Sequence, residues 1–272
     1  MLADTPESSL SDDNMLQRVC FLLGILILPA ALSADIREKT IRYKLDGTAF
    51  EGTLVWQKNA EAKPAILMIP NWMGPTEASL KKAKRIAGEK YVVFMADMYG
   101  VDVRPENASE ASEAAGTVRA DRAMMGARAA KALAVLREQE HAPVLRDEVA
   151  AIGFCFGGGT VLELARAGAD VDAVVSFHGD LMSPTLAEDS DQITASVLVL
   201  HGADDPYVPQ QHVEEFIRAM KGTEADWQLI QYGNTVHSFT DPNADAKGKA
   251  DYHPVSARRA FAAAEQLFSS LW

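Results

Sequence analysis

The sequence predicts an α/β fold: a mainly parallel central sheet with helices on both of its faces. Three observations predict it. From Ala65 onward, short continuous apolar segments alternate with segments that carry apolar residues at helical spacing, which is typical of consecutive strand–helix units. The apolar segments lack the alternation of strands with one face in water, so we expect strands buried on both faces. Upstream, an Asp46-Gly47 turn signal joins two partly alternating stretches and predicts an antiparallel hairpin.

The individual elements are expected in a regular order. Thr76 and Glu77 suit the start of a helix that extends to about Glu89. The alanine-rich segment 109–140 is expected to be helical with a break near Gly116. Segments that are acidic or polar without periodicity are expected to be irregular loops, at 181–194 and 233–251. The remaining predicted elements are the hairpin strands 36–45 and 48–57, the buried strands 65–70, 91–96, 149–153, 171–177, 197–201 and 226–232, and the helices 160–166, 210–221 and 255–271.

The composition is that of an ordinary globular protein. The chain has 272 residues, of which 48% are hydrophobic and 24% are charged. This length suffices for one large α/β domain or two small ones. The formal net charge of −12 argues against nucleic acid and against anionic membrane surfaces as partners. Neither the substrate nor the oligomeric state follows from these numbers.

The N-terminal region has the features of a secretory signal peptide. Arg18 precedes an apolar run, 19–32, and small residues follow up to Ala34. The run is short for a membrane span, so we expect cleavage near Ala34 and a secreted or periplasmic protein. The polar and acidic segment 1–14 is unusual before a signal peptide and favours Met15 as the true start. The alternative is an uncleaved N-terminal anchor.

Cleavage would leave residues 35–272, which we expect to form a single domain with one cysteine, Cys155. The other cysteine, Cys20, belongs to the apolar run that cleavage removes. A lone thiol cannot form an internal disulfide, even in an oxidising compartment. An exported chain that keeps one cysteine therefore favours a reactive thiol.

Cys155 stands at the apex of a predicted strand-to-helix turn. The buried strand 149–153 precedes it, and glycines lie two residues to each side, at Gly153 and Gly157. This arrangement is typical of a nucleophile elbow, in which larger side chains beside the apex would clash with neighbouring backbone. The helix that follows points its N-terminus at the thiol and favours the thiolate. The alternatives are a buried cysteine in an ordinary turn and a phosphate-binding glycine loop, whose spacing fits less well.

A base and an acid are expected at the same edge of the sheet. Ligands of open parallel sheets bind beyond the carboxyl ends of the strands, and Asp205 and His237 lie in loops after two later strands. The chain order of nucleophile, acid and histidine is that of α/β-hydrolases. Asp205 is preferred as the acid over its neighbour Asp204. His178, at the end of another strand, either lines the pocket or is structural.

Three motifs make the similarity to a known family specific. They are Gly-Phe-Cys-Phe-Gly-Gly at 153–158, His-Gly-Ala-Asp-Asp-Pro-Tyr-Val-Pro at 201–209 and His-Ser-Phe at 237–239. With these motifs, the chain from about residue 40 to residue 271 resembles the dienelactone hydrolase family of α/β-hydrolases.

The resemblance implies both a fold and a set of catalytic groups. The fold is the α/β-hydrolase fold, and the family's Cys-His-Asp triad falls on Cys155, His237 and Asp205. The family's oxyanion hole consists of two backbone N–H groups. By position, these belong to Phe156 and Trp72.

Two departures from the family pattern bear on the substrate. The family carries a glutamate where this chain has Asn71, and an arginine that holds the substrate carboxylate where this chain has Asp241. A second family arginine has no certain match, and Arg104 only lies nearby in the sequence. Fold and triad are therefore expected to carry over, whereas dienelactone as the substrate is not.

We expect a hydrolase of small-molecule esters or lactones that forms an acyl-enzyme on Cys155. No histidine pairs with another ligand type at metal-ligand spacing, so neither a metal nor a cofactor is expected. After signal cleavage we expect no membrane contact. The competing hypothesis is a non-hydrolytic thiol protein, such as a redox sensor or a ligand-binding relative. Residues expected to contact the substrate are Asn71, Met73, Tyr99, His178 and Phe239.

Overall fold

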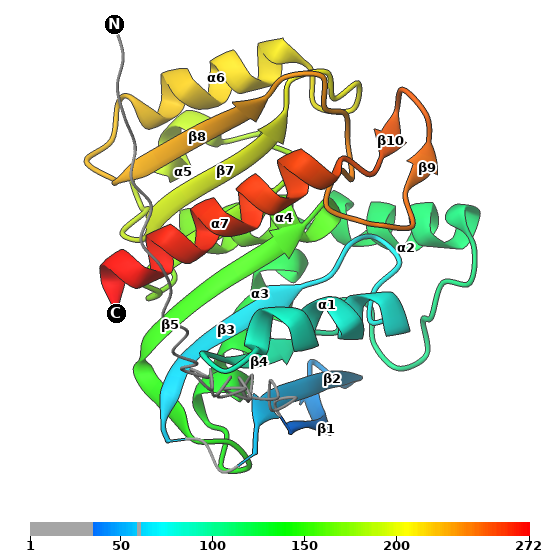
Figure 1. Cartoon of the computed structure of the whole chain (residues 1–272), viewed down its shortest axis with the longest axis vertical. Coiled ribbons are helices and arrows are strands. Elements are labelled where there is room, and N and C mark those ends of the chain that lie inside the picture. The colour runs from blue at the N-terminus through cyan, green and yellow to red at the C-terminus, as the bar shows by residue number, and fades with distance from the viewer. Residues whose placement is uncertain (1–34, 59–60) are drawn as a thin grey trace, which may run out of the picture. The chain divides into compact units, whose positions relative to one another are not determined.

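An eight-stranded sheet in the order β1-β2-β4-β3-β5-β6-β7-β8 forms the centre of the structure (Figure 1). The computed structural model describes residues 35–58 and 61–272, and the predicted signal peptide lies outside them. Within these residues, no helix combines the length and apolar character that a bilayer crossing requires. The strands are β1 (Ile36–Leu45), β2 (Thr48–Gln57), β3 (Lys63–Ile69), β4 (Val92–Met95), β5 (Val144–Phe154), β6 (Ala173–Phe177), β7 (Ser196–Gly202) and β8 (Trp227–Tyr232).

The hairpin supplies the antiparallel part of the sheet. β1 pairs with β2, and β2 pairs antiparallel with β4, whereas every neighbouring pair from β4 to β8 is parallel. The turn residues Asp46 and Gly47 have φ angles of 48° and 81°. A type I′ turn needs positive φ at both of these positions. The predicted parallel sheet behind an antiparallel hairpin is confirmed.

Helices cover both faces of this sheet. One apolar cluster packs α1 and α7 against Ile66 and Met68 of β3, and these two helices lie in front of the sheet in Figure 1. The second cluster contains residues of α3, α4 and α6 together with Leu67 and Ile69. Successive residues of β3 therefore point to opposite apolar layers, which explains why the strand has no polar side. The helices are α1 (Glu77–Ala87), α2 (Ala108–Ala120), α3 (Arg122–Arg137), α4 (Phe156–Arg166), α5 (Leu186–Ser190), α6 (Gln210–Met220) and α7 (Pro254–Leu271).

The long helical segment after β4 breaks at Asp121, so the predicted break near Gly116 was wrong. The Asp121 carboxylate accepts a hydrogen bond from the backbone N–H of Met124 at 2.9 Å and caps the start of α3. Gly116 lies inside α2. A capping side chain, rather than the low helix propensity of glycine, thus determines the boundary.

Two loops contain short elements that were not predicted. The segment 181–194 includes the five-residue helix α5. The segment 233–251 includes a two-stranded ribbon, β9 (Asp245–Ala246) and β10 (Ala250–Asp251). These elements are too short for a periodicity argument to detect.

The carboxyl ends of the parallel strands meet at one edge of the sheet, as in other open α/β sheets. Each strand from β3 to β8 is followed there by a loop with at least one polar residue of interest. In sequence order these residues are Asn71, Asp97, Cys155, His178, Asp205 and His237.

Candidate active site

The turn at Cys155 has the geometry of a nucleophile elbow. Cys155 directly follows β5 and precedes α4, with φ of 53° and ψ of −114°. This is a strained conformation for a residue with a side chain. A Cβ on Gly153 would lie 1.9 Å from the carbonyl oxygen of Gly157, and a Cβ on Gly157 would lie 2.2 Å from that of Ile69. Only glycine fits at both positions.

Asp205 and His237 are hydrogen-bonded to each other beside this turn. The distance from Nδ1 of His237 to Oδ2 of Asp205 is 2.7 Å, and both residues are buried. The other carboxylate oxygen accepts the backbone N–H groups of Tyr207 and Val208 at 2.8 and 3.2 Å. Asp204, the alternative acid, is exposed. The preference for Asp205 over Asp204 therefore agrees with the contacts of His237.

The thiol of Cys155 and the imidazole of His237 change each other's pKa. Burial would raise the pKa of the thiol, but the hydrogen bond and charge of His237, followed by the charge of Arg119 and the N–H of Phe156, lower it. Burial would lower the pKa of His237, but hydrogen bonds to Asp205 and Cys155, with their negative charges, raise it to about 10. Both shifts favour a thiolate–imidazolium pair.

These shifts predict a bell-shaped dependence of ester turnover on pH. Turnover should rise as the pH passes the lowered pKa of Cys155, because the thiolate is the nucleophile. It should fall again as His237 loses its proton near pH 10, because the imidazolium is then no longer available as an acid. The measurement is kcat/KM for a p-nitrophenyl ester between pH 5 and 11, with circular dichroism as the control for folding. Turnover that rises only above the ordinary thiol pKa would contradict the ion pair.

Phe156 and Trp72 carry the two backbone N–H groups that are candidates for an oxyanion hole. The N–H of Phe156, at the first turn of α4, donates toward the Cys155 sulfur. The N–H of Trp72 has no hydrogen-bond acceptor among residues 35–58 and 61–272. Asn71 shapes this loop, since its carbonyl accepts the N–H of Gly74 at 2.9 Å and its side chain accepts that of Met73 at 3.1 Å. The tight turn leaves the intervening N–H free to bind a ligand oxygen.

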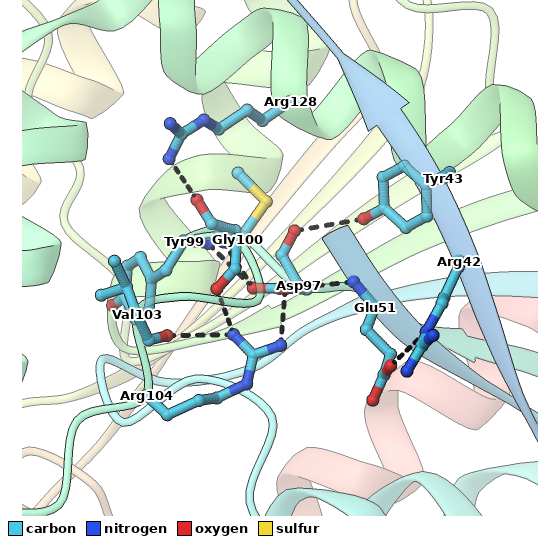
Figure 2. A network of polar contacts seen from close by, with 10 residues as sticks. Arg42, Tyr43, Glu51, Asp97, Tyr99, Gly100, Val103, Arg104 and Arg128 are labelled. Atoms are coloured by element: carbon cyan, nitrogen blue, oxygen red, sulfur yellow. Dashed lines mark hydrogen bonds and ion pairs between the residues drawn. The ribbon is translucent and has the colours of Figure 1, made fainter. Parts of the chain in front are cut away.

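A buried network around Asp97 shapes the loop after β4 (Figure 2). The fully buried carboxylate of Asp97 accepts the backbone N–H groups of Tyr99 and Gly100 at 2.9 and 3.0 Å. It also accepts the N–H of Glu51 at 3.2 Å and pairs with Arg104 at 2.8 Å. Because it neutralises the carboxylate and binds loop carbonyls, the guanidinium of Arg104 is occupied within the protein rather than presented to a substrate carboxylate.

The same network supports the candidate oxyanion hole. Tyr99, which the Asp97 carboxylate orients through its N–H, donates its hydroxyl proton to the carbonyl of Trp72 at 2.7 Å. Burial raises the pKa of Tyr99 well above its ordinary value, so this hydroxyl remains a donor. The loops after β3 and β4 are thereby linked through one hydrogen bond.

The residues expected to contact the substrate differ in exposure. Asn71 and Met73 are partly exposed. Tyr99, His178 and Phe239 have exposed fractions of only 4%, 2% and 0%. The side chains of His178 and Phe239 also pack against each other, at 5.2 Å between ring centroids. Their contact with a substrate stays a prediction.

A cleft of about 440 Å³ lies between α1, α7 and the loop after β8, and none of Cys155, Asp205 and His237 is among its lining residues. Asn71, Lys82, Phe154 and Asp241 contribute to its lining. The ammonium of Lys82 stands 4.1 Å from the centre of the Phe154 ring. Burial lowers the pKa of Lys82 below its ordinary value, although the charges of Asp241 and Cys155 oppose this shift. The cleft thus brings the amine of Lys82 together with Asp241, the residue expected to repel a carboxylate.

Three residues near the site were not singled out from the sequence. Tyr207 is 57% exposed and its ring meets that of His237 edge-on at 5.2 Å. The guanidinium of Arg119 lies 5.3 Å from the Phe156 ring, and Lys82 lines the cleft. Tyr207 could have been found by its place two residues after Asp205. Arg119 and Lys82 lie on helices, and no sequence signal directs them to the edge of the sheet.

Comparison with known proteins gives consistent relatives. A profile of the dienelactone hydrolase family matches residues 50–271. A solved structure of a dienelactone hydrolase-like promiscuous phosphotriesterase from metagenomic libraries superposes with a TM-score of 0.81 at 36% identity, covering 87% of this chain and 99% of that one. A probable 2-oxo-3-(5-oxofuran-2-ylidene)propanoate lactonase of Bradyrhizobium sp. is 26% identical over 73% of this chain and 80% of its own length. The match to the uncharacterized protein K02A2.1 of Caenorhabditis elegans, 35% identical, covers 36% of this chain and 63% of that protein.

Proposed function

Since the chain belongs to the dienelactone hydrolase family, a family of hydrolases, we propose that it cleaves small-molecule esters or lactones through an acyl-enzyme on Cys155. One observation carries the proposal. The imidazole of His237 is hydrogen-bonded to the carboxylate of Asp205 at 2.7 Å, and it lies near enough to the elbow thiol for each group to shift the other's pKa. A nucleophile, its base and the group that orients the base are the parts that covalent acyl transfer needs.

In the proposed first half-reaction, the thiolate of Cys155 attacks the acyl carbonyl. A C–S bond forms and the carbonyl π electrons move to oxygen. The N–H groups of Phe156 and Trp72 stabilise this oxyanion, a contribution of about 3 kcal/mol per donor in comparable sites. When the oxyanion collapses, the C–O bond to the leaving group breaks. The departing alkoxide takes the proton of the His237 imidazolium and leaves a thioester.

In the second half-reaction, neutral His237 takes a proton from water. The hydroxide equivalent adds to the thioester carbonyl, and the same two N–H groups stabilise the new oxyanion. The C–S bond then breaks, which releases the carboxylic acid and restores the thiolate–imidazolium pair. With a lactone, both halves leave together as one ring-opened hydroxy acid.

The relatives support this substrate class without fixing the substrate. The Bradyrhizobium relative is named for a lactonase activity, and the structural neighbour is described as promiscuous. Export of the protein stays a prediction from residues 15–34.

Trapping the intermediate tests the proposal directly. The protein is mixed with a panel of p-nitrophenyl esters and five- and six-membered lactones, quenched with acid within milliseconds to seconds, and analysed by intact-mass spectrometry. We expect a mass increase equal to the acyl group, which peptide mapping assigns to Cys155 and which Cys155→Ala lacks. Rapid alkylation by iodoacetamide without any acyl adduct or turnover would instead support the non-hydrolytic thiol hypothesis.

A further inference from the structure

His178 occupies an unusual position directly below the nucleophile. It is the first residue after β6, has a φ of 40° and is 2% exposed. A positive φ is unfavourable for histidine, so the fold must hold this residue through other contacts. The side chain makes hydrogen bonds at both ring nitrogens.

The two hydrogen bonds define which nitrogen carries the proton. The backbone N–H of Cys155 is shared between the carbonyl of Phe177 at 3.0 Å and Nδ1 of His178 at 3.2 Å, so Nδ1 acts as an acceptor and carries no hydrogen. Nε2 therefore carries the hydrogen and donates it to Oγ1 of Thr240 at 2.8 Å. Burial, together with the nearby charge of His237, holds the pKa of His178 well below its ordinary value. The ring is a neutral connector between two chain segments.

The two segments that His178 connects carry the nucleophile and the base. Thr240 lies three residues after His237 in the same loop. The ring of His178 also meets the rings of His237 and Phe239 edge-on, with centroids 5.1 and 5.2 Å apart. No hydrogen bond between Cys155 and the backbone of the His237 loop is present in residues 35–58 and 61–272.

We propose that His178 and Thr240 form a positioning pair that sets the distance and angle between the Cys155 thiol and the His237 imidazole. The inference rests on the proposed hydrolysis at Cys155. His178 touches no reacting atom in this role. It anchors the strained backbone of the elbow at one nitrogen and the base-bearing loop at the other, and its ring forms a wall against which the ring of His237 packs.

Separate variants test each end of the pair. Thr240→Val removes the hydroxyl and keeps the shape, and Thr240→Ser is the conservative variant that should restore the bond. His178→Asn can still accept the N–H of Cys155 and tolerates positive φ, but it is too short to reach Thr240. His178→Phe keeps a ring and loses both bonds. The matched control is Thr235→Val, because Thr235 lies in the same loop as Thr240 and makes a comparable buried hydroxyl bond, at 2.8 Å, to Ser256 of α7.

The expected signature is a loss in kcat with little change in KM. Thr240→Val and His178→Asn should each lower kcat about 10-fold, and His178→Phe about 100-fold, with KM within about threefold of the wild type. Thr240→Ser should recover most of the activity. In the double variant His178→Phe/Thr240→Val, the second change should add no further loss, because the bond it removes is already absent. Thr235→Val should lower the melting temperature and leave kcat unchanged.

A second readout does not depend on ester hydrolysis. Without the pair, His237 should be held less firmly against the thiol, so the midpoint of Cys155 alkylation by iodoacetamide should move to higher pH in His178→Phe and Thr240→Val. If the wild type fails to turn over any ester and the midpoint still moves, the proposed function fails and the positioning pair stands. Variants that lose melting temperature as Thr235→Val does, with wild-type kcat and an unmoved midpoint, would overturn the positioning role.

Discussion

Cys155→Ala is expected to lower kcat/KM for p-nitrophenyl esters by at least about 10³-fold, because it removes the only group in the site that can form the acyl intermediate. The thiolate is favoured here by His237, by Arg119 and by the first N–H of α4. These three groups act on the side chain at position 155, and alanine has no atom there that could act as the nucleophile. Cys155 is a half-buried residue, and the change removes only one atom from it, so the melting temperature should shift by only a few degrees.

Cys155→Ser provides the matched comparison for this first variant. The serine hydroxyl keeps the shape but does not ionise near neutral pH, so His237 would have to act as a true general base. The Cys155 thiolate is one of the causes that raise the pKa of His237 to about 10, so this pKa should fall in Cys155→Ser. Serine should still react slowly, because its hydroxyl must lose its proton to His237 during the attack, whereas the thiolate is already ionised. Turnover in Cys155→Ala close to that of the wild type would show that the chemistry takes place elsewhere.

The elbow and the hairpin could be predicted because each depends on a local backbone requirement that the residue types express. Gly153 and Gly157 flank Cys155 because their Cβ atoms would overlap other backbone. Asp46-Gly47 adopts the positive φ angles of a tight turn. Such requirements act within a few residues, so sequence spacing alone is sufficient to detect them.

The Asp97 network could not be predicted, because its members are distant in the chain. Asp97 looks like an ordinary polar residue after a strand, yet it is fully buried, and its contacts join the loop after β4 to β2. Arg104 was noted only as lying near a possible substrate-binding position, and in the structure it neutralises Asp97. Burial of a charge and its compensation are properties of the packed protein rather than of any sequence window.

The walls of the pocket illustrate a second limit of sequence reasoning. Strand order and strand ends place Phe239 and His178 at the correct edge of the sheet. Strand order and strand ends do not determine which side chains are buried below the nucleophile and which remain exposed. Lys82 shows the converse case, since a helix residue with no distinctive neighbours in sequence lines the cleft. Edge placement follows from topology, whereas orientation follows from packing.

The second large effect is expected for Asp205→Asn, which should lower kcat/KM by about 10²- to 10⁴-fold. The change keeps the size of the side chain, and its oxygen can still accept the N–H groups of Tyr207 and Val208, so the loop should fold normally. What is lost is the negative charge 2.7 Å from Nδ1 of His237. That charge is one of the contributions that outweigh burial and hold the imidazole protonated. Without it, the pKa of His237 should fall and the neutral thiol–imidazole state should gain population.

The neighbouring Asp204→Asn variant is the control for this prediction. It makes the same change in net charge one residue away, on an exposed side chain with no contact to His237. A general electrostatic effect of removing one carboxylate would appear in both variants. An orienting role predicts that kcat/KM changes less than about twofold in Asp204→Asn and that the acid limb of Cys155 alkylation moves to higher pH only in Asp205→Asn. The reverse pattern would transfer the role to Asp204, and equal losses would show that His237 responds to the charge of the loop rather than to one hydrogen bond.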